Sequence, residues 1–95
     1  MKMITAEQLL LDNGYEDVVI FNDFSYDTAL IGVSHDNRAI YDYEKMVEWL
    51  MENQNWSSED AIEWIDYNTI RSIPYGGVGV PIVMYSIINK DENEK

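Results

Sequence analysis

The side chains with the greatest capacity for chemistry in this sequence are carboxylates, of which there are eighteen against six lysines and arginines. Two groups of them recur at helical spacing. The first group is Glu44, Glu48 and Glu52, and the second is Glu59, Glu63 and Asp66. Residues three or four positions apart lie on the same side of a helix. Each group is therefore predicted to form one row of negative charge along the outer side of a helix.

Two such rows resemble the charge pattern of a nucleic acid. Four residues of helix span about 6 Å, so two neighbouring rows approach the spacing of one phosphate per about 3.4 Å of a DNA strand. A surface of this kind can occupy a groove that normally binds nucleic acid. The alternative is that both rows are ordinary solvated helix faces that keep the protein in solution. Tyr67 and Arg71, which follow the second row, are residue types that concentrate at protein interfaces.

The sequence contains no recognisable catalytic or metal-binding motif. It has no cysteine, which excludes a disulfide framework and cysteine-based zinc sites, and its one histidine, His35, lies in a polar stretch beside Asp36. No twelve-residue calcium loop is present. The segment Gly76–Gly79 lacks the lysine and hydroxyl residue of a phosphate-binding loop. We therefore expect a protein that is not an enzyme and that has no metal or cofactor.

The net charge of −12 restricts the kinds of partner. Nucleic acids and anionic membranes would be repelled, whereas a basic protein surface would be attracted at a rate that falls with salt. No apolar run approaches the roughly 18 residues of a membrane span, and the N-terminus lacks the pattern of a signal peptide. We expect a cytoplasmic protein that binds neither nucleic acid nor membranes, and the sequence predicts no oligomeric state.

The rows of carboxylates must be held by helices, and the remaining segments read mainly as strands. Thr5, Asp42 and either Ser57 or Ser58 are suited to cap the starts of three helices. The predicted order is helix 6–13, strands 18–21, 29–33 and 39–41, helices from 43 to 53–55 and from about 58 to 68 or 71, and a strand within 80–88.

This order predicts an α+β fold in which a small antiparallel sheet of three to four strands is packed on one face by two to three helices. The length of 95 residues suits one domain, so residues 1–95 are expected to form a single acidic domain with residues 90–95 as a frayed tail.

Several segments of the sequence resemble small uncharacterised proteins of phages and prophages of Firmicutes. These segments are residues 39–50, residues 61–71 with the piece Asp-Tyr-Asn-Thr-Ile-Arg, the Ile-Pro-Tyr piece at 73–75, and residues 81–85. Small acidic phage proteins of this size are similar in character to type II-A anti-CRISPR proteins, although no catalytic residue carries over. The resemblance implies an inhibitor that binds a CRISPR nuclease and blocks its basic DNA-binding groove. The contact residues would be the two carboxylate rows and Tyr67.

Two other functions remain open at this point. The first is an anti-defence protein that binds a small ligand such as a signalling nucleotide, using the aromatic side chains and the Gly76–Gly79 segment. That function requires Arg38 and Arg71 to converge on the anionic ligand. The second is a non-enzymatic interaction module within a phage or host complex.

Overall fold

Each α-helix in the described part of the chain begins after a residue whose side chain caps it. In the computed structural model, which describes residues 4–88, the helices are α1 (Ala6–Asp12), α2 (Tyr43–Gln54) and α3 (Ser58–Trp64). Thr5 Oγ1 accepts a hydrogen bond at 3.1 Å from the α1 backbone, and Ser57 Oγ accepts one at 3.1 Å in α3. The Asp42 carboxylate accepts two, at 2.9 and 3.3 Å, from the first turn of α2. These caps confirm the predicted helix starts.

The three strands form one mixed sheet with the order β1-β2-β3. They are β1 (Leu30–Val33), β2 (Ala39–Asp42) and β3 (Ile82–Met84). β1 and β2 are antiparallel, but β3 runs parallel to β2, so the predicted antiparallel sheet is wrong for its last strand. The reason lies in the connection: α2 and α3 carry the chain back to the start of β2 before β3 begins, as a parallel pair requires. The α+β class with three strands and three helices is confirmed.

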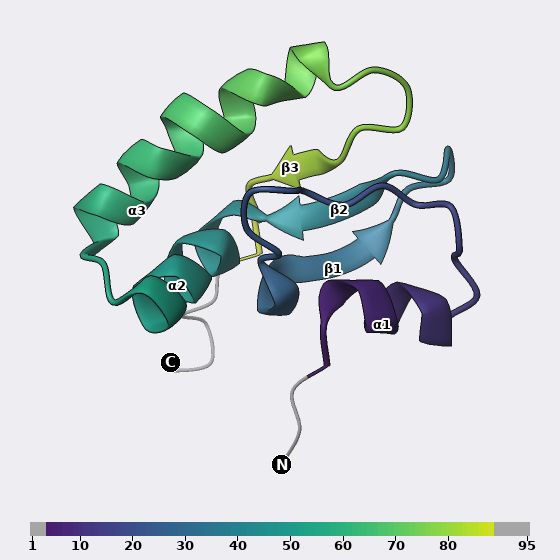
Figure 1. The fold of residues 1–95 in the computed structure, drawn as a ribbon, viewed down its shortest axis with the longest axis horizontal. Helices are drawn as coiled ribbons and strands as arrows, with labels where there is room; N and C mark the ends of the chain where they lie inside the picture. Colours follow the sequence, from purple (N-terminus) through teal and green to yellow (C-terminus); the bar gives the residue numbers. More distant parts are fainter. Residues whose placement is uncertain (1–3, 89–95) are drawn as a thin grey trace.

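The predicted strand at residues 18–21 does not form. Although the segment is rich in β-branched residues, it makes no backbone–backbone hydrogen bond with any other residue of the range 4–88. It runs over the sheet in Figure 1, and the ring of Phe21 lies 4.9 Å from the ring of Tyr41 on the central strand. The segment therefore contributes to the fold by burying side chains on the sheet and not by adding a strand to its edge.

The helix that begins at Ser58 continues beyond α3 and ends in the region that the sequence predicted. Residues Ile65–Ile70 form wider, π-type turns, the α-helix resumes at residues 71–72, and one 3₁₀ turn (Ile73–Tyr75) follows. Figure 1 shows the whole segment as one long helix beyond β3, whereas α1 lies beyond β1. Ile65 and Thr69, four residues apart in the wide turns, are both buried in the core.

The core contains a chain of polar groups. The hydroxyl groups of Tyr26 and Thr69 lie 2.7 Å apart, and Thr69 Oγ1 donates to the Asp23 carboxylate at 3.1 Å. Because Thr69 has a single hydroxyl hydrogen and gives it to Asp23, Tyr26 must be the donor in its bond with Thr69. Burial raises the pKa of Tyr26 to about 12. The remaining large core side chains are apolar or aromatic, and they include Tyr41, Met46, Leu50 and Ile65.

No helix among the described residues is long and apolar enough to cross a membrane.

Candidate partner-binding surface

The predicted contact residues all lie on the surface. We call the six carboxylates of the two rows the acidic rows; all six are exposed, as is Tyr67. The opposite side of α2 is buried through Met46, Trp49 and Leu50, and the corresponding side of α3 through Ala61. The helical spacing therefore predicted the solvent-facing sides of both helices correctly.

A hydrogen bond brings the end of one acidic row next to the start of the other helix. The hydroxyl of Tyr43, the first residue of α2, donates to the Asp66 carboxylate at 3.0 Å. Partial burial, together with this hydrogen bond and the negative charge of Asp66, raises the pKa of Tyr43 to about 12. The ring of Tyr43 also packs against the ring of Tyr85, with 4.8 Å between the ring centroids.

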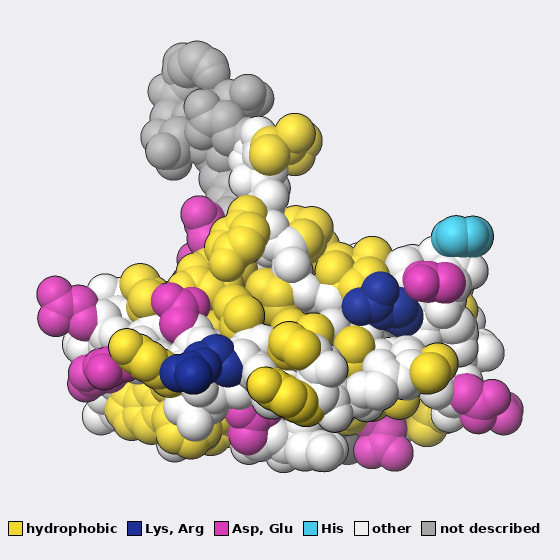
Figure 2. All heavy atoms as spheres, turned by 90° about the horizontal axis from the view of Figure 1, so that it is seen from above, with side chains coloured by type: hydrophobic (Ala, Val, Ile, Leu, Met, Phe, Trp, Pro, Cys, Tyr) yellow, Lys and Arg dark blue, Asp and Glu magenta, His cyan; other side chains and the backbone are white. Residues whose placement is uncertain are grey.

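Acidic side chains do not form a continuous sheet of charge on the face shown in Figure 2. On this face, they lie mainly around the rim, whereas hydrophobic side chains gather in the middle with basic side chains among them. Exposed hydrophobic residues of the second half of the chain include Tyr67, Tyr75, Val78, Tyr85 and Ile87. A partner would therefore meet apolar and aromatic surface together with negative charge.

Arg71 contacts Tyr67 and not a carboxylate. Its guanidinium carbon lies 5.6 Å from the centroid of the Tyr67 ring, which is the geometry of a cation–π contact. Arg71 forms no ion pair with Asp66 or Asp42 within residues 4–88. The one ion pair within residues 4–88 joins Arg38 to Asp36 at 3.9 Å. The hydrogen bond that Ser34 donates to Asp36 lowers the pKa of that carboxyl.

A groove lies between the long helix and the start of β3. We call it the central groove; its volume is about 620 Å³, within the range of ligand sites. Segment 19–23 lines one part of it, Trp64, Asn68 and Ser72 line another, and Val80 and Pro81 lie near β3. Asp23 is the only charged residue in its lining. The groove thus offers apolar walls, amide and hydroxyl groups, and one carboxylate that Thr69 holds in place.

A second hollow lies beside the central groove on the outer side of α3. It has a volume of about 310 Å³ and is lined by Trp56, Asp60, Glu63, Trp64, Tyr67 and Asn68. We call it the aromatic–carboxylate hollow. Sequence reasoning selected Glu63 and Tyr67 but not the two tryptophans or Asp60. The spacing of Asp60, Trp64 and Asn68 by four residues was a signal that could have revealed this side of the helix.

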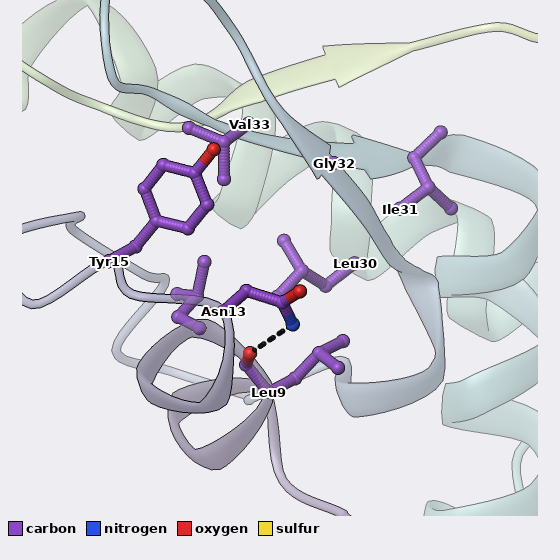
Figure 3. Close-up of a pocket in the computed structure, with 8 residues that line it drawn as sticks. Leu9, Asn13, Tyr15, Leu30, Ile31, Gly32 and Val33 are labelled. Atoms are coloured by element: carbon purple, nitrogen blue, oxygen red, sulfur yellow. Dashed lines mark hydrogen bonds between the residues drawn. The ribbon is translucent and has the colours of Figure 1, made fainter.

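A third hollow, of about 300 Å³, lies between α1 and β1 (Figure 3). Leucine, isoleucine and valine side chains form most of its lining, and no charged residue contributes to it. The Asn13 amide is occupied, because it donates to the carbonyl of Leu9 at 2.8 Å. The hollow therefore has little to offer a polar ligand, and we regard it as a packing gap between α1 and the edge strand.

The two arginines do not converge on any of these hollows. Arg38 donates through Nε to the carbonyl of Val80 at 2.8 Å, and Arg71 lies over Tyr67. Gly77 and Gly79 have positive φ angles of 84° and 83°, which identifies their segment as a tight turn before β3. An anionic nucleotide would thus meet the Asp23 carboxylate in the central groove without a cation to balance it.

The remaining candidate groups for catalysis or metal binding are isolated. Within residues 4–88, no three histidine, aspartate or glutamate side chains lie close enough together to hold a metal ion. His35 is exposed in the turn between β1 and β2.

The chain matches no protein-family model, and no curated protein or solved structure shows significant similarity to it.

Proposed function

We propose that this protein binds a basic surface of another protein through the acidic rows of α2 and α3. The observation that carries the proposal is the exposure of all six carboxylates on two consecutive helices, where Lys45 is the only basic residue between the first and the last of them. Like charges four residues apart cost a helix a few tenths of a kcal/mol per pair. The positive charges of a basic partner would attract these carboxylates and offset the repulsion between them.

The class of partner that we propose is a protein whose basic groove binds nucleic acid, with a type II CRISPR nuclease as the first candidate. Such a groove presents arginine and lysine side chains to phosphates and guanine edges, and these side chains also suit carboxylates. The proposal rests on the resemblance to phage proteins and on the charge of −12. In this role the protein would act as an anti-defence inhibitor that blocks the groove without catalysis.

The contact with the partner is expected to include apolar packing as well as electrostatic attraction, because hydrophobic and aromatic side chains lie beside the acidic rows. Tyr67 is 59% exposed and lies next to Asp66. Tyrosine is enriched among residues that carry binding energy, while charged residues at the rim mainly raise the association rate. We therefore expect the carboxylates to attract and orient the partner and Tyr67 to contribute to its retention.

A pull-down tests this proposal. The tagged protein is incubated with lysate from bacteria that express type II CRISPR components, at low and at high salt. The proposal predicts recovery of the nuclease, with a yield that falls steeply as the salt concentration rises. Failure to recover the nuclease at low salt would refute the CRISPR assignment, and recovery that does not depend on salt would refute the role of the acidic rows.

A further inference from the structure

The aromatic–carboxylate hollow has the composition of a site for a cationic side chain. Trp56, Trp64 and Tyr67 provide aromatic surface, and Asp60 and Glu63 provide negative charge. We propose that this hollow binds the guanidinium group of an arginine on the partner protein. The inference deepens the proposed function, on which the identity of the partner rests, by naming the side chain that the partner inserts.

The two tryptophan rings of the hollow are held in place by contacts with each other and with Phe24. The rings of Trp56 and Trp64 lie 5.8 Å apart, and each also contacts Phe24, at 5.9 and 5.6 Å between centroids. Phe24 in turn lies 5.9 Å from the ring of Trp49 in α2. Because these rings brace one another, the hollow exists before a ligand arrives, and little ordering is required on binding.

The two carboxylates of the hollow lack a positive partner. Within the described part of the chain, the side chains of Asp60 and Glu63 accept no hydrogen bond and form no ion pair. The hydroxyl of Ser57 accepts a hydrogen bond from the backbone amide of Asp60, so this bond does not involve the Asp60 carboxylate. An arginine carries five N–H donors on a planar group that can both pair with carboxylates and stack on an aromatic ring. The charge and the shape of the hollow therefore complement the same side chain.

The protein already contains one contact of the proposed kind. Arg71 places its guanidinium 5.6 Å from the centroid of Tyr67, although Arg71 does not itself line the hollow. Tyr67 can thus accept a guanidinium group on one face of its ring. The hollow would use this ring together with the two tryptophans, which are the aromatic residues with the strongest attraction for cations.

The central groove provides room for the residues that flank the inserted arginine. Trp64 and Asn68 line both hollows, so the two are neighbours that share one wall. The apolar lining of the groove suits aliphatic side chains, and its one charged residue, Asp23, again favours a basic segment. The occupant is therefore expected to be a short basic segment of a protein, with its arginine in the aromatic–carboxylate hollow.

An NMR titration tests the proposal with a defined probe. The probe is the blocked tripeptide Ala-Arg-Ala, and its control is Ala-citrulline-Ala, which has the same shape without the charge. The expected result is a saturable shift of the Trp56 and Trp64 indole N–H signals with the arginine peptide and none with the citrulline peptide. Equal shifts with both peptides, or no shift with either, would overturn the proposal.

Isosteric variants assign the effect to the hollow. Asp60→Asn with Glu63→Gln should weaken binding of the arginine peptide by about tenfold, since each exposed carboxylate pair contributes up to about fivefold. Glu16→Gln with Asp17→Asn removes the same charge at exposed positions outside both the hollow and the acidic rows, and it should leave the affinity within about twofold. Equal weakening by both pairs would contradict a specific site and leave only a general effect of charge.

The two proposals can fail separately. If the tripeptide binds as expected but the nuclease is not recovered, the choice of partner is wrong and the arginine site stands. If the nuclease is recovered in a salt-dependent manner, but the tripeptide shifts no indole signal and Asp60→Asn with Glu63→Gln leaves recovery unchanged, the arginine site is wrong and the acidic-row proposal stands.

Discussion

The hydroxyl of Tyr26 donates to the hydroxyl of Thr69, 2.7 Å away and 43 residues later in the chain. Both side chains are buried, and Thr69 passes its own hydrogen to the Asp23 carboxylate in the wall of the central groove. Tyr26 also has a left-handed backbone conformation, with φ of 47°. The long helix, the segment before β1 and the groove are thus joined by one chain of hydrogen bonds.

This chain of hydrogen bonds predicts a coupled effect on stability. Thr69→Val should lower the free energy of unfolding by about 1 to 3 kcal/mol, because it leaves the Tyr26 hydroxyl buried without an acceptor. Tyr26→Phe should cost about 1 kcal/mol, and the double variant should cost less than the sum of the two. Urea unfolding of the three variants measures this difference.

Tyr41→Phe provides the matched control for Tyr26→Phe. The Tyr41 hydroxyl is also buried, but it has no partner with regular hydrogen-bond geometry. Its removal should change the free energy of unfolding by less than about 0.5 kcal/mol, or increase it. Strict additivity of Tyr26→Phe and Thr69→Val, or equal losses from Tyr26→Phe and Tyr41→Phe, would show that the hydrogen bond has no energetic role.

The stability of the protein should fall steeply at alkaline pH. Burial raises the pKa of Tyr26 and of Tyr41 from the ordinary value of 10.0 to about 12. The unfolded chain loses these protons first, so the stabilisation is complete below pH 10 and disappears as the pH rises toward 12. Each tyrosine should account for about 2 to 3 kcal/mol, from about 1.4 kcal/mol per pKa unit.

Urea unfolding over this range of pH measures the alkaline effect. Tyr41→Phe should remove roughly a third of the pH dependence, since the pKa values of Tyr26, Tyr41 and Tyr43 are all raised to about 12 and one of these three groups is lost. A free energy of unfolding that stays constant between pH 10 and pH 12 would contradict the burial of the Tyr26 and Tyr41 hydroxyl groups.

Two glycines should respond in opposite ways to alanine. Gly14, just after α1, has φ of 90°, a conformation that alanine adopts at a cost of about 1 kcal/mol or more. Gly32 in β1 has no positive φ, and an added Cβ would meet no atom within 4 Å. Gly32→Ala should therefore stabilise the protein by about 0.4 to 1 kcal/mol. Thermal unfolding of the two variants tests this contrast, and a destabilised Gly32→Ala would refute it.

Local interactions explain which elements the sequence predicted. Thr5, Asp42 and Ser57 cap helices through bonds to amides two or three residues away, so a short window of sequence contains the complete signal. The strand predicted at residues 18–21 failed for the opposite reason. Its β propensity is local, but its position depends on the contact of Phe21 with Tyr41, which lies twenty residues later in the chain. Pairing requires a free strand edge, which propensity does not specify.

The same distinction holds for the candidate surface. The exposure of the acidic rows followed from helical periodicity, because the buried positions of α2 recur on the opposite side. The aromatic–carboxylate hollow depends on Phe24, which reaches Trp56 and Trp64 from a distant segment. It also includes Tyr67, which belongs to the wide turns after Trp64. The spacing of Asp60, Trp64 and Asn68 indicates one side of this helix, but it predicts neither the contact with Phe24 nor the wide turns.

The affinity for a purified type II CRISPR nuclease, measured by calorimetry at two salt concentrations, tests the central claim most directly. Three proteins are compared: the unchanged chain, Glu48→Lys with Glu63→Lys, and Glu16→Lys with Asp17→Lys, which makes the same charge change at exposed positions outside the rows. Lysine at position 48 would lie four residues from Glu44 and Glu52, and lysine at position 63 would lie four residues from Glu59. These pairs of opposite charge stabilise a helix, so the fold should persist. We predict salt-sensitive binding by the unchanged chain and the control pair, and loss of binding by the pair in the rows. Equal affinity of all three proteins, or no binding by the unchanged chain, would contradict the proposed function.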